Sequence, residues 1–210
     1  MRISTKPAEQ LQTVIYATPH GDGWVTFRGD QPWELGLPGE AAGCEAVPAA
    51  RLSAAAARWV DLLERYFAGE RVVFPLDVAA FAEAHGCTRF EAAVLGALAD
   101  VPYGSTVSYR ELAERAGRPA AQRAAGSVMA RNPLPVILPC HRVVRSDGTL
   151  GNYGDDPRWK AKLLTLEGAL PAAGRQRAHP ASDSGKVAGP ASQRAAGAAL
   201  RAAAPARGGA

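Results

Sequence analysis

The 210-residue sequence contains little cysteine, and the spacing of what it has argues against two kinds of site. Its three cysteines, Cys44, Cys87 and Cys140, lie far apart and include no C-x-x-C pair. Disulfide frameworks and structural zinc sites need paired cysteines at characteristic spacings, so we expect three free thiols. The four histidines show no H-E-x-x-H or similar ligand spacing. We therefore expect no metal and no other cofactor.

Long hydrophobic runs are absent as well. No eighteen consecutive residues are apolar, and residues 1–10 lack the apolar core of a secretory signal. The hydrophobic and charged fractions, 47% and 21%, are ordinary for a globular protein. We therefore expect a cytoplasmic protein without a membrane partner.

The charge of the chain is unevenly distributed behind a net value of +4. Residues 1–100 hold 8 basic and 13 acidic side chains, whereas residues 101–170 hold 10 and 6, and residues 171–210 hold 6 and 1. Positive charge therefore gathers in the second half of the chain. This asymmetry favours a nucleic-acid partner, although charged runs are also common on ordinary solvated surfaces.

The N-terminal part is typical of a small α/β unit. Apolar and β-branched runs at 14–16 and 24–27 flank a turn-rich segment at 18–23, which predicts a β-hairpin. Residues 30–50 are rich in Pro, Gly and Ala without periodicity, so we expect a loop there. Ser53 then caps a predicted helix. The apolar positions of that helix are Trp59, Leu62, Leu63, Tyr66 and Phe67.

A helical pattern begins at Thr88 and continues until Pro102 stops it. The sequence at 108–111, Ser-Tyr-Arg-Glu, is a capping box that opens a second, short helix. Gly117 permits a tight turn, and a third helix is expected at about 120–130. Two short helices joined through a glycine-containing turn form a helix-turn-helix.

This pair of helices has two interpretations. It can be an αα-hairpin that packs only for stability, or it can bind DNA. The composition of the second helix favours DNA binding, because Ala121, Ala124 and Gly126 leave a smooth surface around Arg123. Such a helix can approach a nucleic-acid backbone closely, and its N-terminal amides can bind phosphate.

The last forty residues differ in composition from the rest of the chain. They consist mostly of Ala, Gly, Pro, Ser and Arg, with almost no large apolar side chain. A segment of this kind cannot bury enough surface to fold, so we expect a disordered basic tail at 171–210. The tail either adds sequence-independent attraction to DNA or is a passive extension.

The most informative segment runs from Asn132 to Val144 and reads NPLPVILPCHRVV. A lone cysteine is commonly an inert small hydrophobe, and a lone histidine is more often structural than catalytic. Here three prolines disfavour a regular central strand and stiffen the connection, which can hold a nucleophile at the wall of a pocket. Neighbouring side chains on an extended strand point to opposite faces, so we do not assume direct contact between Cys140 and His141.

With these residues the sequence resembles the O6-alkylguanine-DNA alkyltransferase family, whose signature Pro-Cys-His-Arg-Val stands unchanged at 139–143. The similarity covers about 88–168 well and the N-terminal part only in outline. The other matching motifs are Val101-Pro102-Tyr103-Gly104, Ser108-Tyr109, Asn132-Pro133, Gly148 to Tyr153, Lys162-Leu163-Leu164 and Glu167-Gly168. The resemblance implies an α/β fold, with a small RNase H-like domain at 1–84 and a mainly helical, winged-helix-like domain at 85–170.

The resemblance also implies DNA repair by a suicide alkyltransferase. An alkyl group would move from O6-alkylguanine in duplex DNA, or from O4-alkylthymine, to Cys140 of a monomeric protein, because a soft thiolate suits attack on an sp3 carbon. His141 would generate the thiolate through an ordered water while Glu167 holds the imidazole in its working tautomer. No second nucleophile is visible that could remove the alkyl group, so one molecule would repair one lesion.

The remaining site residues follow from the same resemblance. Tyr109 would donate a hydrogen bond to the leaving guanine, and Asn132 would tie the recognition helix to the active-site segment. Arg123 would fill the gap left by a flipped nucleotide while its helix lies in the minor groove. The base pocket would be lined by Met129, Pro135, Val143, Tyr153 and Gly154.

The sequence departs from the family pattern near that pocket. Asp155 and Asp156 replace a usual Gly-Gly pair, which predicts slower DNA binding or another substrate preference. Gly154 stands where some relatives carry a serine that helps to bind the guanine oxygen, so only its backbone amide is available. Three rival functions share part of the pattern. A lesion-binding protein without transfer lacks the reactive cysteine, a regulator that senses methylation needs a second sensor domain, and a Cys/His/Glu hydrolase needs no counterpart of Arg123.

Overall fold

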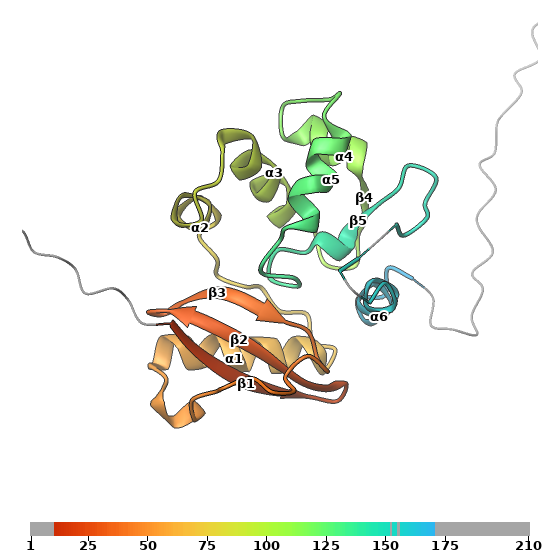
Figure 1. Cartoon of the computed structure of the whole chain (residues 1–210). Coiled ribbons are helices and arrows are strands. Elements are labelled where there is room, and N and C mark those ends of the chain that lie inside the picture. Colours follow the sequence, from red (N-terminus) through yellow and green to blue (C-terminus); the bar gives the residue numbers. More distant parts are fainter. Residues whose placement is uncertain (1–10, 152, 155, 171–210) are drawn as a thin grey trace, which may run out of the picture. The chain divides into compact units, whose positions relative to one another are not determined.

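The computed structural model of the chain describes residues 11–151, 153–154 and 156–170 (Figure 1). The tail expected at 171–210 lies outside the described residues, as does Asp155. The described residues belong to one compact unit and form a mixed α/β fold of helices and two small sheets. The division into domains at 1–84 and 85–170 stays a prediction. Within the described ranges, no helix is both long and apolar enough to cross a membrane.

A three-stranded antiparallel sheet forms the N-terminal part, in the order β1-β2-β3. The expected hairpin is confirmed as β1 (Leu11–Thr18) and β2 (Gly21–Arg28). The expected loop at 30–50 is wrong in part, because β3 (Gln31–Gly36) pairs with β2. A register shift in that pairing and a proline within β3 obscure the two-residue alternation of a strand, and an edge strand tolerates both.

Helix α1 (Ala54–Phe67) covers one face of this sheet (Figure 1). Its start is confirmed, because the Ser53 side chain accepts a hydrogen bond from the Ala56 amide. The apolar stripe predicted from the sequence faces the sheet, and Phe67 stacks on Tyr16 with 5.8 Å between ring centroids. The residues between β3 and α1 contain one short 3-10 helix, η1 (Ala49–Arg51).

Two helices follow a connecting segment. The sequence pattern missed α2 (Val78–Ala84), which is capped by Asp77, because two turns of helix are too short for an apolar repeat to stand out. Helix α3 (Arg89–Ala99) was expected, and its capping box is present, with Thr88 and Glu91 bonding to each other's backbone amides.

The two helices expected around Gly117 are confirmed as α4 (Tyr109–Arg115) and α5 (Gln122–Ala130). The capping box at the start of α4 is present. A two-stranded parallel sheet joins β4 (Val107–Ser108) to β5 (Val143–Val144), so the start of α4 lies beside the segment that carries Cys140. Whether the helix pair binds DNA stays a prediction.

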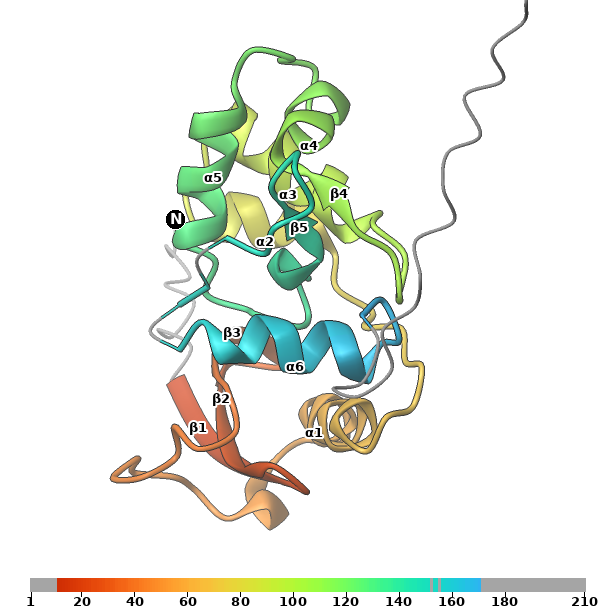
Figure 2. The ribbon, with the colours of Figure 1, turned by 90° about the vertical axis from the view of Figure 1, so that its right-hand side faces the viewer.

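The last described element, α6 (Arg158–Leu166), lies between α1 and the 3-10 helix η2 (Cys140–Arg142) (Figure 2). Trp159 at its start packs edge-on against Phe67 of α1, with 6.1 Å between ring centroids. The helix ends at Glu167, its C-cap, and Gly168 follows with a positive φ of 74°. This ending turns the Glu167 side chain toward the interior, where it meets the site.

Candidate functional site

Cys140 begins η2 directly after the proline-rich segment. Within the described part of the chain no strand interrupts 132–139, which confirms the irregular connection that the prolines predicted. Val136 in this connection has a φ of 75°, a left-handed conformation that β-branched residues rarely adopt. The extended strand assumed for Cys140 and His141 is wrong, because the Arg142 amide bonds to the Pro139 carbonyl (2.9 Å) and closes a 3-10 turn.

The Cys140 thiol is almost fully buried, with 8% of the residue exposed. The Asn132 amide donates to its sulfur (3.1 Å) and to the Leu138 carbonyl (2.8 Å), so it fixes the sulfur against the loop. Burial raises the pKa of Cys140, and the bond from Asn132 opposes that shift only in part. The thiol is therefore protonated at neutral pH and needs a base before it can attack.

His141 supplies a base with a defined tautomer. Its Nε2 lies 2.8 Å from Oε1 of Glu167, and its Nδ1 has no hydrogen-bond partner among the described residues. Because a carboxylate only accepts, the hydrogen lies on Nε2 and the lone pair on Nδ1. Burial lowers the pKa of His141 although the bond to Glu167 opposes it, so the ring is neutral and Nδ1 can accept a proton.

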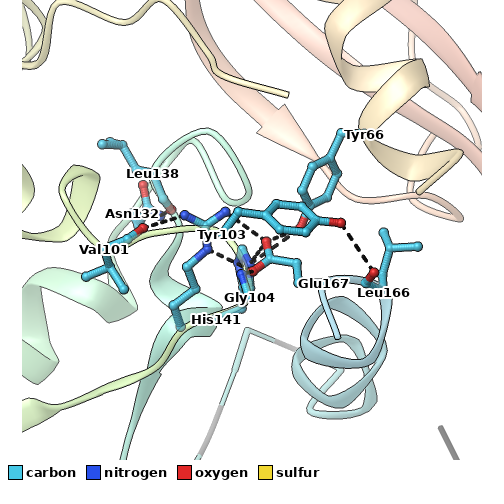
Figure 3. Close-up of polar contacts among 10 residues, drawn as sticks. Tyr66, Val101, Tyr103, Gly104, Asn132, Leu138, His141, Leu166 and Glu167 are labelled. Carbon is cyan, nitrogen blue, oxygen red and sulfur yellow. Dashed lines mark hydrogen bonds and ion pairs between the residues drawn. The ribbon is translucent and has the colours of Figure 1, made fainter. Parts of the chain in front are cut away.

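Glu167 is the centre of a buried group of donors, shown in Figure 3. Its carboxylate accepts from the Tyr66 hydroxyl (2.7 Å), from His141, from Arg142 Nε and Nη2 (2.9 and 2.8 Å) and from the Gly104 amide (3.1 Å). Burial alone would raise the pKa of Glu167, but the bonds from His141 and Arg142 outweigh it and hold the pKa at about 2. We call these five residues the carboxylate cluster.

Gly104 is required in the cluster by its backbone. Its φ is 75°, and a Cβ there would lie 2.9 Å from the backbone oxygen of Glu167. The Val101 carbonyl in the same turn accepts from Arg142 Nη1 (2.6 Å), and the Tyr103 hydroxyl donates to the Leu166 carbonyl (3.3 Å). Through these hydrogen bonds the Val-Pro-Tyr-Gly motif holds Arg142 and the end of α6 in place.

Sequence reasoning missed a buried lysine beside the nucleophile. Lys160 is fully buried, its Nζ donates to the Val143 carbonyl (2.5 Å), and it lies 5.8 Å from the centroid of the Tyr109 ring. Burial lowers its pKa to about 8, while a negative charge on Cys140 acts in the opposite direction. A signal existed, since Lys160 falls on the same helical face as the apolar Leu163 and Leu164.

The predicted pocket residues divide into two groups. Asn132, Pro135, Tyr153 and Gly154 line one recess together with Cys140, and the recess has a volume of about 230 Å³. Met129 and Val143 are buried but do not line that recess. The Tyr153 hydroxyl is buried and makes no hydrogen bond of normal geometry among the described residues, but it lies close enough to the Cys140 sulfur to lower the pKa of that thiol.

Tyr109 also lies outside the recess but remains close to the reacting group. It is half-buried at the first position of α4, and burial raises the pKa of its phenol. The nearby sulfur of Cys140 raises that pKa further, so the hydroxyl keeps its proton and can donate it.

The predicted DNA-binding residues all lie at the start of α5. Arg123 and Ala124 are exposed, Ala121 and Gly126 are half-buried, and no described acidic side chain pairs with Arg123. No side chain caps this helix at Ala121. Asp156, near the pocket, is paired with Arg158 (2.9 Å), so its charge is partly compensated.

The described residues include no group of three His, Cys, Asp or Glu side chains that could hold a metal ion. A buried thiol, a neutral imidazole with a free lone pair and a carboxylate behind it are the parts of a nucleophile-base-acid relay.

Comparison with known proteins identifies similar chains. The family profile described as "6-O-methylguanine DNA methyltransferase, DNA binding domain" matches residues 89–169. Two relatives are named methylated-DNA–protein-cysteine methyltransferase. The one from Methanothermobacter thermautotrophicus is 40% identical over 109 residues, 52% of this chain and 59% of that protein. The one from Mycobacterium leprae is 44% identical over 108 residues, 51% of this chain and 62% of that protein. The match thus spans about three fifths of these relatives.

Solved structures extend the similarity to the N-terminal part. The crystal structure of Mycobacterium tuberculosis O6-methylguanine methyltransferase is 30% identical, covers 78% of this chain and 96% of that chain, and has a TM-score of 0.59. The Mycobacterium tuberculosis protein OGT in complex with DNA is 31% identical, covers 75% and 93%, and has a TM-score of 0.61. The likeness therefore includes the sheet and α1, which the sequence motifs matched only in outline.

Proposed function

Because the chain belongs to the O6-methylguanine-DNA methyltransferase family, we propose that it repairs alkylated DNA by transferring an alkyl group to its own Cys140. The substrate is duplex DNA that contains O6-alkylguanine, with O4-alkylthymine as a second lesion. The observation that carries this proposal is the buried thiol beside a neutral His141, whose Nε2 is engaged by Glu167 while Nδ1 keeps its lone pair.

The proposed transfer uses these groups together with an ordered water and Tyr109. The thiol proton passes through an ordered water to Nδ1 of His141, and Glu167 stabilises the imidazolium that forms. The sulfur then attacks the alkyl carbon, so the S–C bond forms as the C–O6 bond breaks. The leaving guanine gains negative charge and takes a proton from Tyr109, which is replenished by the proton held on His141. The products are a thioether on Cys140 and an unmodified guanine.

The groups around the thiol assist the leaving base and hold it in place. Asn132 positions the sulfur and links the loop after α5 to η2. Pro135, Tyr153 and Gly154 contact the base or its alkyl group in the recess, and Met129 and Val143 support that wall from inside. The Tyr153 hydroxyl makes no hydrogen bond of normal geometry, so it offers a donor that a bound base can meet.

A base that reacts at a buried thiol has to leave the helical stack. We propose that α5 lies in the minor groove, where its small residues Ala121, Ala124 and Gly126 allow close approach. The exposed Arg123 then fills the space of the flipped nucleotide. The minor groove carries a degenerate code, so this contact reads little sequence.

The finer fold assignment belongs to the same proposal. We interpret the sheet β1–β3 with α1 as RNase H-like, since a single helix covers one face of an antiparallel sheet. We interpret α4 and α5 with the β4–β5 pair as winged-helix-like. The protein would act in the cytoplasm as a monomer and without a cofactor.

Each molecule would act once, because the thioether that forms on Cys140 is a poor leaving group. The decisive experiment is to incubate the protein with a duplex that contains O6-methylguanine and to weigh it. We expect the peptide that contains Cys140 to gain the mass of one methylene group. The variant Cys140→Ala should bind the duplex and gain nothing; an unmodified wild-type thiol after long exposure would exclude the transfer.

A further inference from the structure

The recess beside Cys140 has walls from two parts of the fold. One wall is the predicted pocket already described. The other comes from the N-terminal sheet, through Trp24 on β2 and through β3 with the turn that follows it. Its volume of about 230 Å³ is below the roughly 300–1,000 Å³ typical of small-molecule pockets. The recess therefore suits a substituent on a reacting carbon and is too small for a whole nucleotide.

The sheet wall is fixed to the loop that precedes the nucleophile. The Leu35 amide, on the free edge of β3, donates to the Pro133 carbonyl over 2.8 Å. Leu35 and Leu37 are both buried and present apolar surface to the recess together with Trp24. The N-terminal sheet is thus part of the same frame that holds Cys140, and its side chains keep a defined position relative to the sulfur.

Two carboxylates lie in this wall, and no basic side chain lines the described recess. Glu34 is exposed on β3, opposite Thr26 in the sheet. Glu40 is exposed in the following turn, where Oε2 accepts from the Leu37 amide (2.9 Å). That bond anchors the Glu40 carboxylate instead of leaving it free to swing into solvent.

We propose that Glu34 and Glu40 make the recess select alkyl groups by charge. The inference rests on the proposed transfer, in which the carbon bound to O6 meets the sulfur and any larger substituent on it extends into the recess. Neutral and cationic substituents fit beside two carboxylates. Anionic substituents are repelled by the two carboxylates, although solvent screens this repulsion in part because both side chains are exposed.

The test uses two lesions of matched shape. O6-carbamoylmethylguanine and O6-carboxymethylguanine differ by one negative charge, and single-turnover rates on both are measured in duplexes and normalised to O6-methylguanine for each protein. We expect the wild type to transfer the neutral group at least about tenfold faster than the anionic one. Glu34→Gln and Glu40→Gln should each reduce this ratio about threefold, and the double variant about tenfold. Comparing variants with wild type cancels the intrinsic difference in reactivity between the two groups.

The substitutions are chosen to keep the fold. Glutamine retains an acceptor oxygen for the Leu37 amide, and thermal unfolding checks that the turn survives. Glu83→Gln is the matched control, because it removes the same charge from an exposed position on α2 that does not line the recess. Its ratio should equal that of the wild type.

The outcomes separate the two proposals. Methyl transfer together with an unchanged ratio in the double variant would overturn the charge selectivity alone. A ratio that falls equally in Glu83→Gln would overturn it too, because the effect would then come from net charge. Absence of methyl transfer in the wild type would overturn the proposed function and this inference with it.

Discussion

The carboxylate cluster and the surroundings of the Cys140 thiol differ in how completely their polar groups are paired. In the cluster, both oxygens of Glu167 accept hydrogen bonds, and Arg142 and Tyr66 are fully engaged. Beside the thiol, the Tyr153 hydroxyl makes no hydrogen bond of normal geometry, and His141 Nδ1 has no partner among the described residues.

The charges of the two sides differ in the same way. In the cluster a buried carboxylate stays ionised, with a pKa of about 2, because donors surround it. Beside the thiol, burial raises the pKa of Cys140 and lowers that of Lys160 to about 8, so the environment disfavours charge there. The hydrogen bonds of the carboxylate cluster are therefore complete before substrate binds. The surroundings of Cys140 keep unused hydrogen-bonding groups that a substrate can meet.

Removing the positive charge of Arg142 should have the largest effect on the carboxylate cluster. In Arg142→Met, the buried Glu167 carboxylate loses the bonds from Nε and Nη2, and the Val101 carbonyl loses the bond from Nη1. Breaking a buried ion pair from one side costs about 3–5 kcal/mol because the remaining charge stays uncompensated. We expect a loss of that size in the free energy of unfolding, measured with urea.

The matched control breaks an exposed pair. Arg158 bonds to Asp156 at a similar distance (2.9 Å), but its side chain is 82% exposed. Arg158→Met should cost less than about 1 kcal/mol, since solvent screens such pairs. Equal losses in the two variants would mean that the cluster is not the preassembled half of the site.

Acid should weaken the cluster selectively. Because the pKa of Glu167 is lowered from 4.5 to about 2 in the folded state, its contribution is complete above the unfolded value and is lost as pH falls through the folded value. The difference corresponds to about 3 kcal/mol. We expect the free energy of unfolding to fall by that amount between about pH 5 and pH 2, in urea titrations at each pH.

The variant Glu167→Gln isolates this component, because it removes the titrating group. Its stability should depend on pH less than that of the wild type by the same amount. The other carboxyls with lowered pKa values, Glu91, Glu111, Asp147 and Asp156, are more accessible to solvent and remain in both proteins. Parallel pH curves for the two proteins would contradict the assignment.

The sequence predicted the fold best where the signal is local. The helices expected from Thr88 and from the capping box at Ser108 both begin there, because capping bonds span only three residues. It failed for β3, where Pro32 and a register shift break the alternation, and for α2, which is too short to show a period. Elements that depend on what packs over them carry little signal of their own.

The candidate site follows the same division. Cys140 and His141 adjoin in one motif and are visible in the sequence, and Glu167 was reached through the family resemblance. Tyr66 lies 101 residues from Glu167, so only the packing of α1 against α6 brings them together. Lys160 reads as an ordinary helical lysine until the helix around it is covered. The contact between Tyr66 and Glu167 and the burial of Lys160 therefore depend on packing that local sequence patterns do not show.

Tyr66 should give the smallest effect and the most specific one. Tyr66→Phe removes the bond to Glu167 Oε1 but leaves no buried donor unpaired, so we expect a loss of about 1–2 kcal/mol in the free energy of unfolding. With one donor fewer, the carboxylate attracts the imidazolium more strongly, which raises the pKa of His141. The limb of the pH–rate profile for alkyl transfer that reports His141 should therefore move to higher pH, an effect that a purely structural role would not produce.

Tyr103→Phe is the control that separates an effect on the charge of Glu167 from an effect on packing. Tyr103 also lies beside the cluster, with 6.2 Å between its ring centroid and that of Tyr66, but its hydroxyl donates to the neutral Leu166 carbonyl. Its loss should cost less than about 1 kcal/mol and leave the pH–rate profile in place, because the charge on Glu167 keeps all its donors. If both variants moved the profile equally, the shift would reflect looser packing around α1, and Tyr66 would not be a positioning residue for the base.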